Sequence, residues 1–277
     1  MNIQFHKPTS FLSAHIESMV WFKDFEPQHA VERVVPGGQA YLIFEFDGMP
    51  RHTLHNDTLQ PTGTFTKVWV SGVHTDFLSI STHNGSQMLA IQFTATGARP
   101  FMHIPMHTIA GKVVPAEDVF GAEIFALCDT IGAAQESAAK FAAAEDWLTA
   151  RHDGRKAAPA PFLALLHRIH SEQRLRLADI VGTYPATHKQ LIQHFKKYVG
   201  ISPKEYHRII RFNEILKAIH QTETVSWSQL AYTLDYSDQS HFIKEFRHFS
   251  GFNPVEFLQL GHQHNEELNF FPLTAQG

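Results

Sequence analysis

An internal repeat in the last third of the chain limits what this sequence can fold into more than any other feature. The segments FKKYVGISPKEY (195–206) and FRHFSGFNPVEF (246–257) match at a phenylalanine, a glycine, a proline and a glutamate, each pair 51 residues apart. In both copies, a helix with aromatic spacing ends at a glycine that suits the left-handed C′ position, and a new helix begins shortly afterwards. The repeat therefore predicts two copies of one helical unit.

The start of the helix that follows each glycine also repeats. Ser202 and Asn253 each offer a side-chain oxygen as N-cap, Pro203 and Pro254 suit the first helical position, and a glutamate stands at the third. The first of these helices could run to about residue 219, a length of ~25 Å at ~1.5 Å per residue. A rod of that length would hold the two units at a fixed separation.

Within each copy a short helix precedes the aromatic-spaced one, and this order is that of a helix-turn-helix. The short helices are expected at RLADIVGTY (176–184) and WSQLAYTL (227–234), followed by the turns PAT and DYSD. The second helix of each copy follows its turn, carries the aromatic spacing and would be the recognition helix.

Each expected recognition helix has an apolar face and a polar face. Thr187 and Gln190 form a capping box at the start of the first. The apolar faces consist of Leu191, Phe195, Tyr198 and Val199 in the first copy and Phe242, Phe246 and Phe249 in the second. These side chains are expected to hold the helices on their domain.

The polar faces carry residue types that can read a major groove. Glutamine pairs with adenine, lysine with guanine, and isoleucine can contact a thymine methyl group. Lysine, arginine and the backbone amides at helix starts suit phosphate contacts. The predicted DNA-binding residues are Thr187, His188, Lys189, Ile192, Gln193, Lys196, Lys197, Gln239, Ser240, Ile243, Lys244 and Arg247.

Two other interpretations of this region stay open on the residues alone. Any surface helix carries polar residues opposite its core face, and a helical repeat for protein contact would also be periodic. Ile192 and Ile243 on the polar faces favour a contact surface over plain solvation. DNA binding should weaken steeply with salt, whereas a protein-interaction module should not.

The first 115 residues have the pattern of a β-rich domain. Short apolar runs at 39–46, 67–73, 77–82 and 88–97, separated by Gly and Asn, predict strands of a barrel or sandwich. The segment 48–64 is expected to be a loop. Helical spacing then predicts helices over 116–131 and 136–150. The predicted fold class is α+β multidomain: a β-rich, barrel- or sandwich-like N-terminal domain followed by an all-α double helix-turn-helix domain.

The segment RHDGRKAAPAP (151–161) has the glycine, prolines and charge of a linker. We therefore expect a sensory or oligomerisation domain over 1–150 that ends in helices, a linker over 151–161, a DNA-binding domain over 162–260 and a tail over 261–277. The DNA-binding part holds 12 lysines and arginines against nine acids, although the whole chain has a net charge of −4. A basic block on an acidic chain favours a polyanionic partner.

Composition excludes several classes of protein. The single cysteine, Cys128, rules out an internal disulfide framework and a cysteine-built zinc site, and it fits a reducing compartment. The N-terminus lacks a basic start followed by an apolar block, and no run of about 18 apolar residues exists. We expect a cytoplasmic protein with no membrane partner.

The N-terminal region shows no clear catalytic or metal-binding pattern. His52 with His55 and His103 with His107 have the spacing of a ligand pair, but the first pair lies in the expected loop and Pro105 interrupts the second. No third ligand is clear, so we expect no metal, no cofactor and no catalytic residue. Cys128 is expected to be a small core residue.

An apolar ligand in the β-rich domain stays an alternative. Barrel interiors and domain junctions commonly hold such sites. Phe44, Phe46, Trp69 and Phe93 could line one, although such residues are more often plain core. The competing hypothesis is therefore an enzyme or a small-ligand-binding protein with its site in the N-terminal β domain.

The segment WSQLAYTLDYSDQSHFIKEFRHFSGFNPVEF (227–257) resembles the signature of AraC/XylS-type transcription regulators. The shared pattern is Leu-Ala, a turn before a tyrosine, Asp-Gln-Ser-His-Phe, an aromatic and basic helix, a glycine, and then a proline and a terminal aromatic. The resemblance covers about 162–260. Carried over by position, it implies that the first recognition helix is 187–199 and the second 238–249. It implies a seven-helix domain with two helix-turn-helix units that binds double-stranded DNA to activate or repress transcription, with RNA polymerase as a further partner. The chain departs from the family pattern at Pro185, Gln193 and Asp235.

The N-terminal part resembles the β-rich domain of one AraC subgroup. The phrases that carry this resemblance are VPGGQAYLIFEFDG (35–48), VSGVHTDFLSI (70–80) and AIQFTATGARPFMHIPM (90–106). The resemblance implies a regulatory role without assigning a ligand. We expect a small-molecule effector or a homodimer as the further partners of this domain. The predicted function is a sequence-specific DNA-binding transcription regulator whose two helix-turn-helix units read adjacent major-groove segments.

Overall fold

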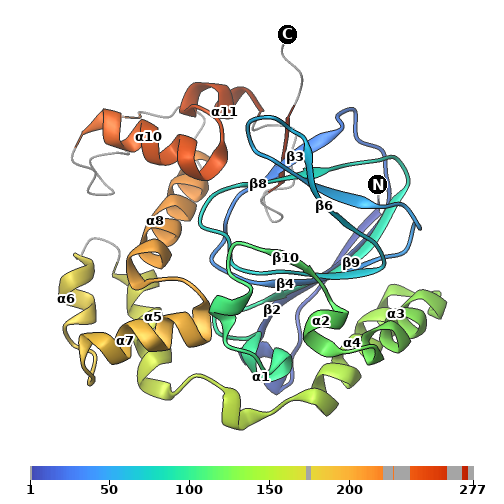
Figure 1. Ribbon diagram of the computed structural model, residues 1–277, viewed down its shortest axis with the longest axis horizontal. Coiled ribbons are helices and arrows are strands. Elements are labelled where there is room, and N and C mark those ends of the chain that lie inside the picture. The colour runs from blue at the N-terminus through green and yellow to red at the C-terminus, as the bar shows by residue number, and fades with distance from the viewer. Residues whose placement is uncertain (1, 173–175, 221–226, 228–237, 261–269, 274–277) are drawn as a thin grey trace.

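The computed structural model places strands on one side of the molecule and most helices of the C-terminal part on the other (Figure 1). It describes all residues except 1, 173–175, 221–226, 228–237, 261–269 and 274–277. Among the described residues, no helix combines the length and hydrophobicity that crossing a bilayer requires.

The strands form two antiparallel sheets. In the six-stranded sheet the order is β1 (Asn2–His6), β2 (Ile16–Phe25), β9 (Ser86–Phe93), β4 (Tyr41–Glu45), β7 (Val68–Ser71) and β10 (Val113–Pro115). In the five-stranded sheet it is β11 (Phe270–Pro272), β3 (Val31–Val34), β8 (Leu78–Ser81), β5 (Arg51–Leu54) and β6 (Pro61–Phe65). The predicted β-rich N-terminal domain is confirmed, and each of the four predicted strands is present.

The central strands β4 and β7 of the six-stranded sheet are buried on both faces, which explains their continuous apolar runs. Side chains of a strand point alternately to the two faces. Ile43 lies with Trp69, Ile80 and Met88 between the two sheets. Its neighbour Phe44 points to the opposite face.

Short helices cover that second face. They are the 3₁₀ turns η1 (Phe11–Ala14) and η2 (Met106–Thr108) and the helices α1 (Arg99–Met102), α2 (Glu117–Phe120), α3 (Glu123–Ala133) and α4 (Ser137–Arg151). The helix predicted over 116–131 is divided at Gly121, whose φ of 78° is left-handed. Cys128 is buried in this core as predicted, and burial raises the pKa of its thiol to about 11.

The prediction of a loop over 48–64 was wrong, because β5 and β6 form a hairpin there. The strand was not predicted because Arg51, a polar residue, occupies a buried position that normally holds an apolar side chain. Its guanidinium donates from Nε and Nη2 to the carboxylate of Glu45 at 3.0 Å each. Trp69 Nε1 donates to the same carboxylate at 3.2 Å. A buried ion pair with these extra hydrogen bonds replaces apolar packing between the sheets.

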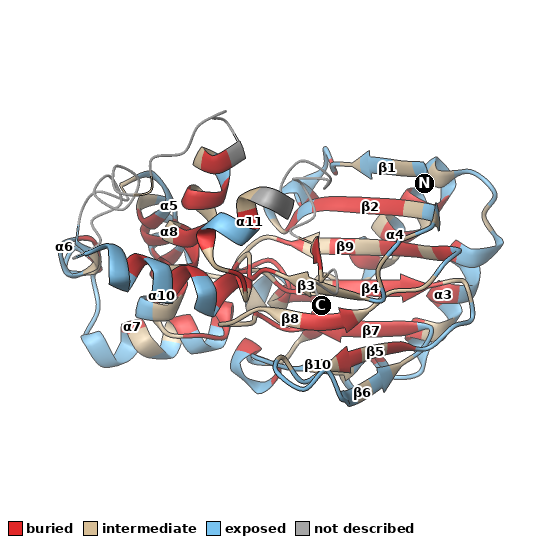
Figure 2. Cartoon of the chain, turned by 90° about the horizontal axis from the view of Figure 1, so that it is seen from above, coloured by how far each residue is buried: buried red, intermediate tan, exposed pale blue. Residues whose placement is uncertain are grey.

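The C-terminal part is helical, as predicted. After the 3₁₀ turn η3 (Gly154–Lys156) come α5 (Ala160–Ser171), α6 (Leu177–Val181), α7 (His188–His194), the π-helical turn η4 (Phe195–Val199), α8 (Pro203–His220), α10 (Gln239–Ser250) and α11 (Pro254–Leu260). Their inner faces are buried and their outer faces exposed (Figure 2). The predicted short helix 227–234 lies outside the described residues except for Trp227.

Strand β11 belongs to the segment beyond the predicted DNA-binding domain, and it returns to the N-terminal sheet. Phe270, Phe271 and Pro272 pair with Val34, Arg33 and Glu32 of β3. The Phe271 ring also packs on Phe257 of α11, with the ring centroids 4.6 Å apart. The two parts of the chain are therefore joined by strand pairing as well as by the segment 151–161.

Candidate nucleic-acid interface

Helix α7 begins at the predicted capping box. Gln190 N donates to Thr187 Oγ1 at 3.3 Å, and the Gln190 side chain accepts from Thr187 N at 3.0 Å. His188, Lys189 and Gln193 are exposed and Ile192 is half-buried, whereas Leu191 is buried. The predicted polar and apolar faces of this helix are confirmed.

The end of the first recognition helix differs from the regular helix predicted over 187–199. Residues 195–199 form the π-helical turn η4, in which Gly200 N donates to Phe195 O at 2.8 Å. This wider turn is a feature that often marks functional sites in helices. Phe195 is fully buried, while Lys196 and Lys197 remain exposed. The two lysines therefore extend the polar face of α7.

Helix α10 is the second recognition helix. Asp238 caps it by accepting from His241 N at 2.8 Å, and its C-cap is Gly251 with a φ of 76°. The exposed side chains include all five predicted for this copy: Gln239, Ser240, Ile243, Lys244 and Arg247.

The opposite face of α10 is an aromatic core. Phe242 and Phe246 are fully buried and Phe249 is 1% exposed. The Phe246 ring contacts the rings of Phe212 and Phe257 at centroid distances of 5.3 and 5.2 Å. The predicted division of α10 into a buried aromatic face and an exposed polar face is confirmed.

The repeated caps after both glycines are present. Glu205 N donates to Ser202 Oγ at 3.2 Å and Ser202 N donates to Glu205 Oε2 at 2.8 Å. Asn253 and Glu256 make the same reciprocal pair at 2.9 Å each. The first capped helix, α8, spans the 18 residues Pro203–His220. At ~1.5 Å per residue it is ~27 Å long, and it separates the two recognition helices.

The sequence analysis missed one residue that positions α10. Glu245 is buried on the inner face and accepts from Arg208 Nε of α8 at 2.9 Å. Its position three residues after Phe242 places it on the apolar face, so helical spacing could have revealed it.

The charges on the two recognition helices have one sign at the surface. Residues 188–199 contain Lys189, Lys196 and Lys197, and residues 239–250 contain Lys244 and Arg247. The one acidic residue in these two ranges, Glu245, is buried and paired with Arg208. The exposed acid next to α10, Asp238, is its N-cap. The exposed lysines and arginine of the two helices suit phosphate groups.

The N-terminal domain divides its candidate ligand residues between two hydrophobic cores. Phe44 and Phe93 lie in the core under the helices, whereas Trp69 lies between the sheets. Phe46 is partly buried against the former core. His52 Nδ1 is 3.0 Å from Thr64 Oγ1. The described part of the chain contains no group of three or more histidine, cysteine, aspartate or glutamate residues placed to hold a metal ion.

Comparison with known families assigns the C-terminal part. Residues 177–259, which contain both recognition helices, match a family model described as a helix-turn-helix domain. This part of the chain is an AraC-type helix-turn-helix domain. Residues 4–115 match a second model, described as a domain of unknown function, DUF6597. The resemblance drawn from 227–257 is thereby confirmed.

One curated relative shares part of the chain. The uncharacterized HTH-type transcriptional regulator YidL of Escherichia coli K12 is 33% identical over 102 residues, which are 36% of this chain and 34% of that protein. The chain thus spans about a third of the length of this relative.

Comparison with solved structures gives distant similarities. ToxT from Vibrio cholerae O395 is 12% identical, with a TM-score of 0.44 over 86% of this chain and 98% of that one. An AraC-type DNA-binding domain-containing regulator from Chromobacterium violaceum is 24% identical, with a TM-score of 0.33 over 39% of this chain and 100% of that one. Neither TM-score reaches 0.5.

Proposed function

We propose that this protein is a sequence-specific transcription regulator whose AraC-type domain binds two adjacent major-groove segments of double-stranded DNA. The observation that carries the proposal is the matched pair of recognition helices. Each has a buried aromatic face and an exposed face that carries lysine or arginine side chains. The name of the relative, an HTH-type transcriptional regulator, supports the same function.

The middle of each helix supplies the side chains that read bases. In the first helix these are Lys189, Ile192 and Gln193, and in the second they are Ser240, Ile243 and Lys244. Glutamine and lysine hydrogen-bond to adenine and guanine edges, and isoleucine contacts the thymine methyl group. Both isoleucines retain exposed surface although they are apolar, and Ile243 is 37% exposed. Contact with a base edge would cover that surface.

The remaining predicted residues contact the phosphate backbone. Thr187, His188 and Gln239 lie at the starts of the two helices, where the positive end of the helix dipole favours an anion. Lys196, Lys197 and Arg247 lie towards the helix ends and are exposed. Such contacts fix the register of the protein on the duplex but do not specify sequence.

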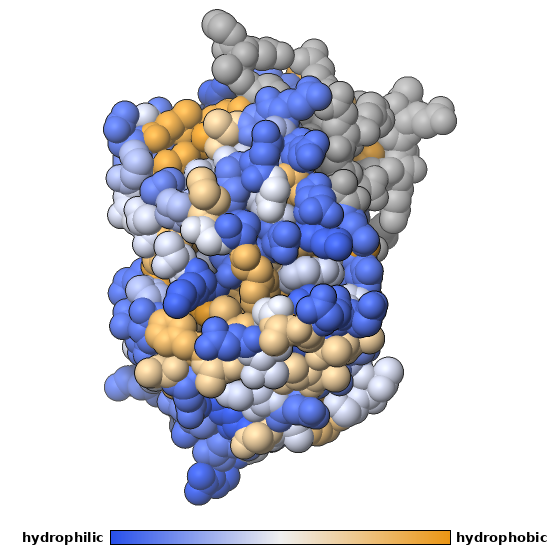
Figure 3. Space-filling view, turned by 90° about the vertical axis from the view of Figure 1, so that its right-hand side faces the viewer, coloured by the Kyte–Doolittle hydropathy of each residue, from blue (hydrophilic) through white to orange (hydrophobic). Residues whose placement is uncertain are grey.

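The N-terminal domain regulates this binding. A cavity of about 250 Å³ lies where it meets α5 and α8, lined in part by Gln39, His170 and Tyr206, and a small effector would bind there. RNA polymerase would be the partner in transcription, and cytoplasmic DNA the target. A homodimer would use the side of the molecule in Figure 3, where hydrophobic patches lie among hydrophilic residues.

Selection from random duplexes tests the proposal. The full chain is expected to enrich a two-part site whose parts are about one helical turn apart. With six to ten phosphate contacts, affinity should fall by roughly 10³–10⁵ between 50 and 200 mM salt. Failure to enrich any sequence, or binding that ignores salt, would reject it.

A further inference from the structure

Each recognition helix ends at a glycine that contacts the N-terminal domain. A Cβ added to Gly200 would lie 3.1 Å from Met106 O of η2, and one added to Gly251 would lie 2.7 Å from Arg33 Nη1 of β3. Both glycines also have positive φ, at 108° and 76°. The two equivalent points of the repeat are therefore both docking points for the β-rich domain.

At the second recognition helix the contact is made by Arg33. Its Nη1 donates to Gly251 O at 2.6 Å. The guanidinium carbon lies 4.8 Å from the centre of the Phe77 ring and 4.5 Å from that of Phe252. A cation at the carbonyl end of α10 also complements the negative end of the helix dipole. Arg33 thus joins β3 to the C-terminus of the second recognition helix.

A second arginine acts at the first recognition helix. The Arg99 guanidinium carbon lies 5.3 Å from the centre of the Tyr198 ring, two residues before Gly200. Arg99 Nη1 also donates to Lys156 O at 2.5 Å. Each unit is therefore held near its glycine by an arginine of the first 115 residues that stacks on an aromatic ring.

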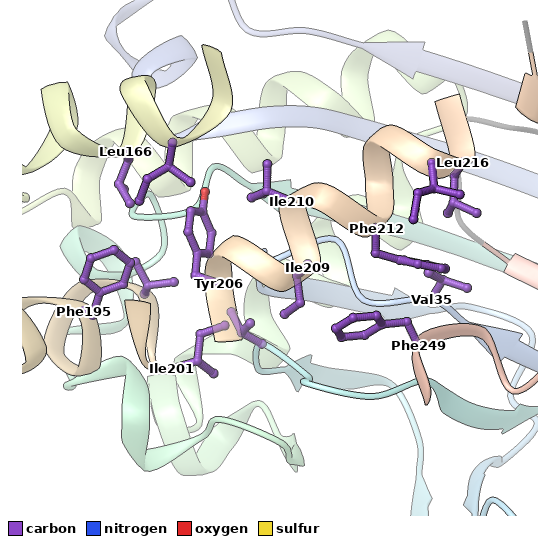
Figure 4. Packing of buried hydrophobic residues seen from close by; sticks show 14 of the residues in the cluster. Val35, Leu166, Phe195, Ile201, Tyr206, Ile209, Ile210, Phe212, Leu216 and Phe249 are labelled. Carbon is purple, nitrogen blue, oxygen red and sulfur yellow. The ribbon is translucent and has the colours of Figure 1, made fainter. Parts of the chain in front are cut away.

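The contacts continue along α8 between the two docking points. Asn213 Nδ2 donates to Pro36 O at 2.9 Å. Val35, which follows β3 directly, is buried in the same cluster as Phe212 and Phe249 (Figure 4). Because the core of the AraC-type domain includes residues of the β-rich domain, the two parts pack as one body along this line.

Docking leaves the polar faces open. Gln193, Lys196, Ser240, Lys244 and Arg247 are all exposed in the docked arrangement. The contact therefore does not act by covering the residues proposed to bind DNA. It fixes where the ends of the two helices lie.

We propose that Arg33 is a positioning residue for the second recognition helix, which it holds at Gly251. Met106 and Arg99 hold the end of the first recognition helix in the same way. Through these contacts the N-terminal domain sets the separation and rotation of the two recognition helices. This proposal rests on the proposed function. A rigidly held pair gains affinity from simultaneous binding only when the two half-sites match its spacing. The docked protein accepts one spacing of its two-part site, and loss of Arg33 relaxes that requirement.

Binding to spaced duplexes tests the role of Arg33. The full chain and Arg33→Met are titrated with the selected site and with the same site carrying an insertion of about half a helical turn. The parent should lose roughly 100-fold in affinity on insertion, and Arg33→Met less than about 10-fold. Lys23→Met, which removes an exposed cation of β2, is the control and should behave as the parent. Equal spacing penalties in Arg33→Met and the parent would overturn the proposal.

A distance measurement without DNA separates this inference from the proposed function. Spin labels at Gln193→Cys and Lys244→Cys report on the two polar faces, and the buried Cys128 should stay unlabelled. The parent should give one narrow distance distribution, and Arg33→Met a broader one. Equally narrow distributions would overturn the proposal, even where DNA binding is confirmed. If the parent binds no DNA, the proposed function is rejected. The distance distributions, which need no DNA, then still test the role of Arg33.

Folding is checked by circular dichroism before either experiment. If Arg33→Met does not fold, Arg33→Lys replaces it in both. Lysine keeps the positive charge but lacks the planar group that stacks on Phe77 and Phe252. The spacing penalty and the width of the distance distribution of Arg33→Lys are then compared with those of the parent, and equal values would overturn the proposal.

Discussion

Arg208 Nε lies 2.9 Å from Glu245 Oε2, so the helix that separates the two units is bonded to the inner face of the second recognition helix. The Glu245 side chain is 4% exposed and that of Arg208 32% exposed. A carboxylate buried to this extent needs its partner, because an unpaired buried charge is costly.

Arg208→Met should lower the free energy of unfolding by about 1.5–3 kcal/mol, the usual value for a hydrogen bond to a charged group. Chemical denaturation followed by circular dichroism measures it. Arg155→Met is the matched control, since the Arg155 side chain is 91% exposed and pairs with Asp153 at the surface. That control should leave stability close to that of the parent, because an exposed ion pair is screened by solvent and contributes little. Equal losses in the two variants would contradict a special role for the Arg208–Glu245 pair.

Lys244→Ala should weaken specific DNA binding by about 1–3 kcal/mol, the range for a base-reading side chain, and leave the melting temperature nearly unchanged. The reason is that Lys244 is exposed on the outer face of α10. Titration of the selected duplex measures the effect. Lys217→Ala, an exposed lysine of α8 paired with Glu214, controls for the lost charge. Parent-like affinity of Lys244→Ala would remove this residue from the interface.

Phe246→Ala should destabilise the protein by about 3–5 kcal/mol, because truncating a buried phenylalanine removes burial and leaves a cavity. Phe246 is fully buried between Phe212 and Phe257. Ile243→Ala on the same helix is the control and should cost far less, since Ile243 is 37% exposed. The comparison fails if both variants unfold at the same denaturant concentration.

His207 should make stability fall in mild acid. Burial, with Arg211 nearby, lowers its pKa to about 4, while Glu245 acts in the opposite direction. The ordinary value is 6.5, so between about pH 6.5 and 4 the unfolded chain binds a proton that the folded chain does not. The contribution of His207 to the free energy of unfolding is therefore fully present above pH 6.5, and it is lost as the pH falls towards 4.

Replacement of His207 tests that decline. His207→Gln should flatten the dependence of unfolding free energy on pH over this window. His248→Gln, at an exposed position of α10, should keep the slope of the parent. Parallel curves for the parent and His207→Gln would show that another group causes the decline.

Local signals in the sequence predicted the helical repeat well. The capping box at Thr187, the paired caps at Ser202 and Asn253, and the left-handed glycines all depend on residues within a few positions of one another. The linking helix, expected to reach about residue 219, ends at His220. Such caps are visible in sequence because the hydrogen bonds that form them are local.

The features that the sequence did not predict depend on contacts between distant residues. The β5 strand depends on Arg51 pairing with Glu45. The strand β11 needs β3, more than 200 residues earlier, as its partner. The bond from Arg33 to Gly251 likewise joins residues with no local pattern in common. A polar residue at a buried position, or a short strand near a chain end, is recognisable only when its partner is known.

The central claim is that two recognition helices occupy adjacent major-groove segments. Methylation interference tests it most directly, because methylated guanine N7 blocks contacts in the major groove. The full chain should show two clusters of interfering guanines about 10 base pairs apart on the selected site. Gln193→Ala should weaken only one cluster, and Lys244→Ala only the other. A single cluster, or equal loss from both clusters in each variant, would contradict the account.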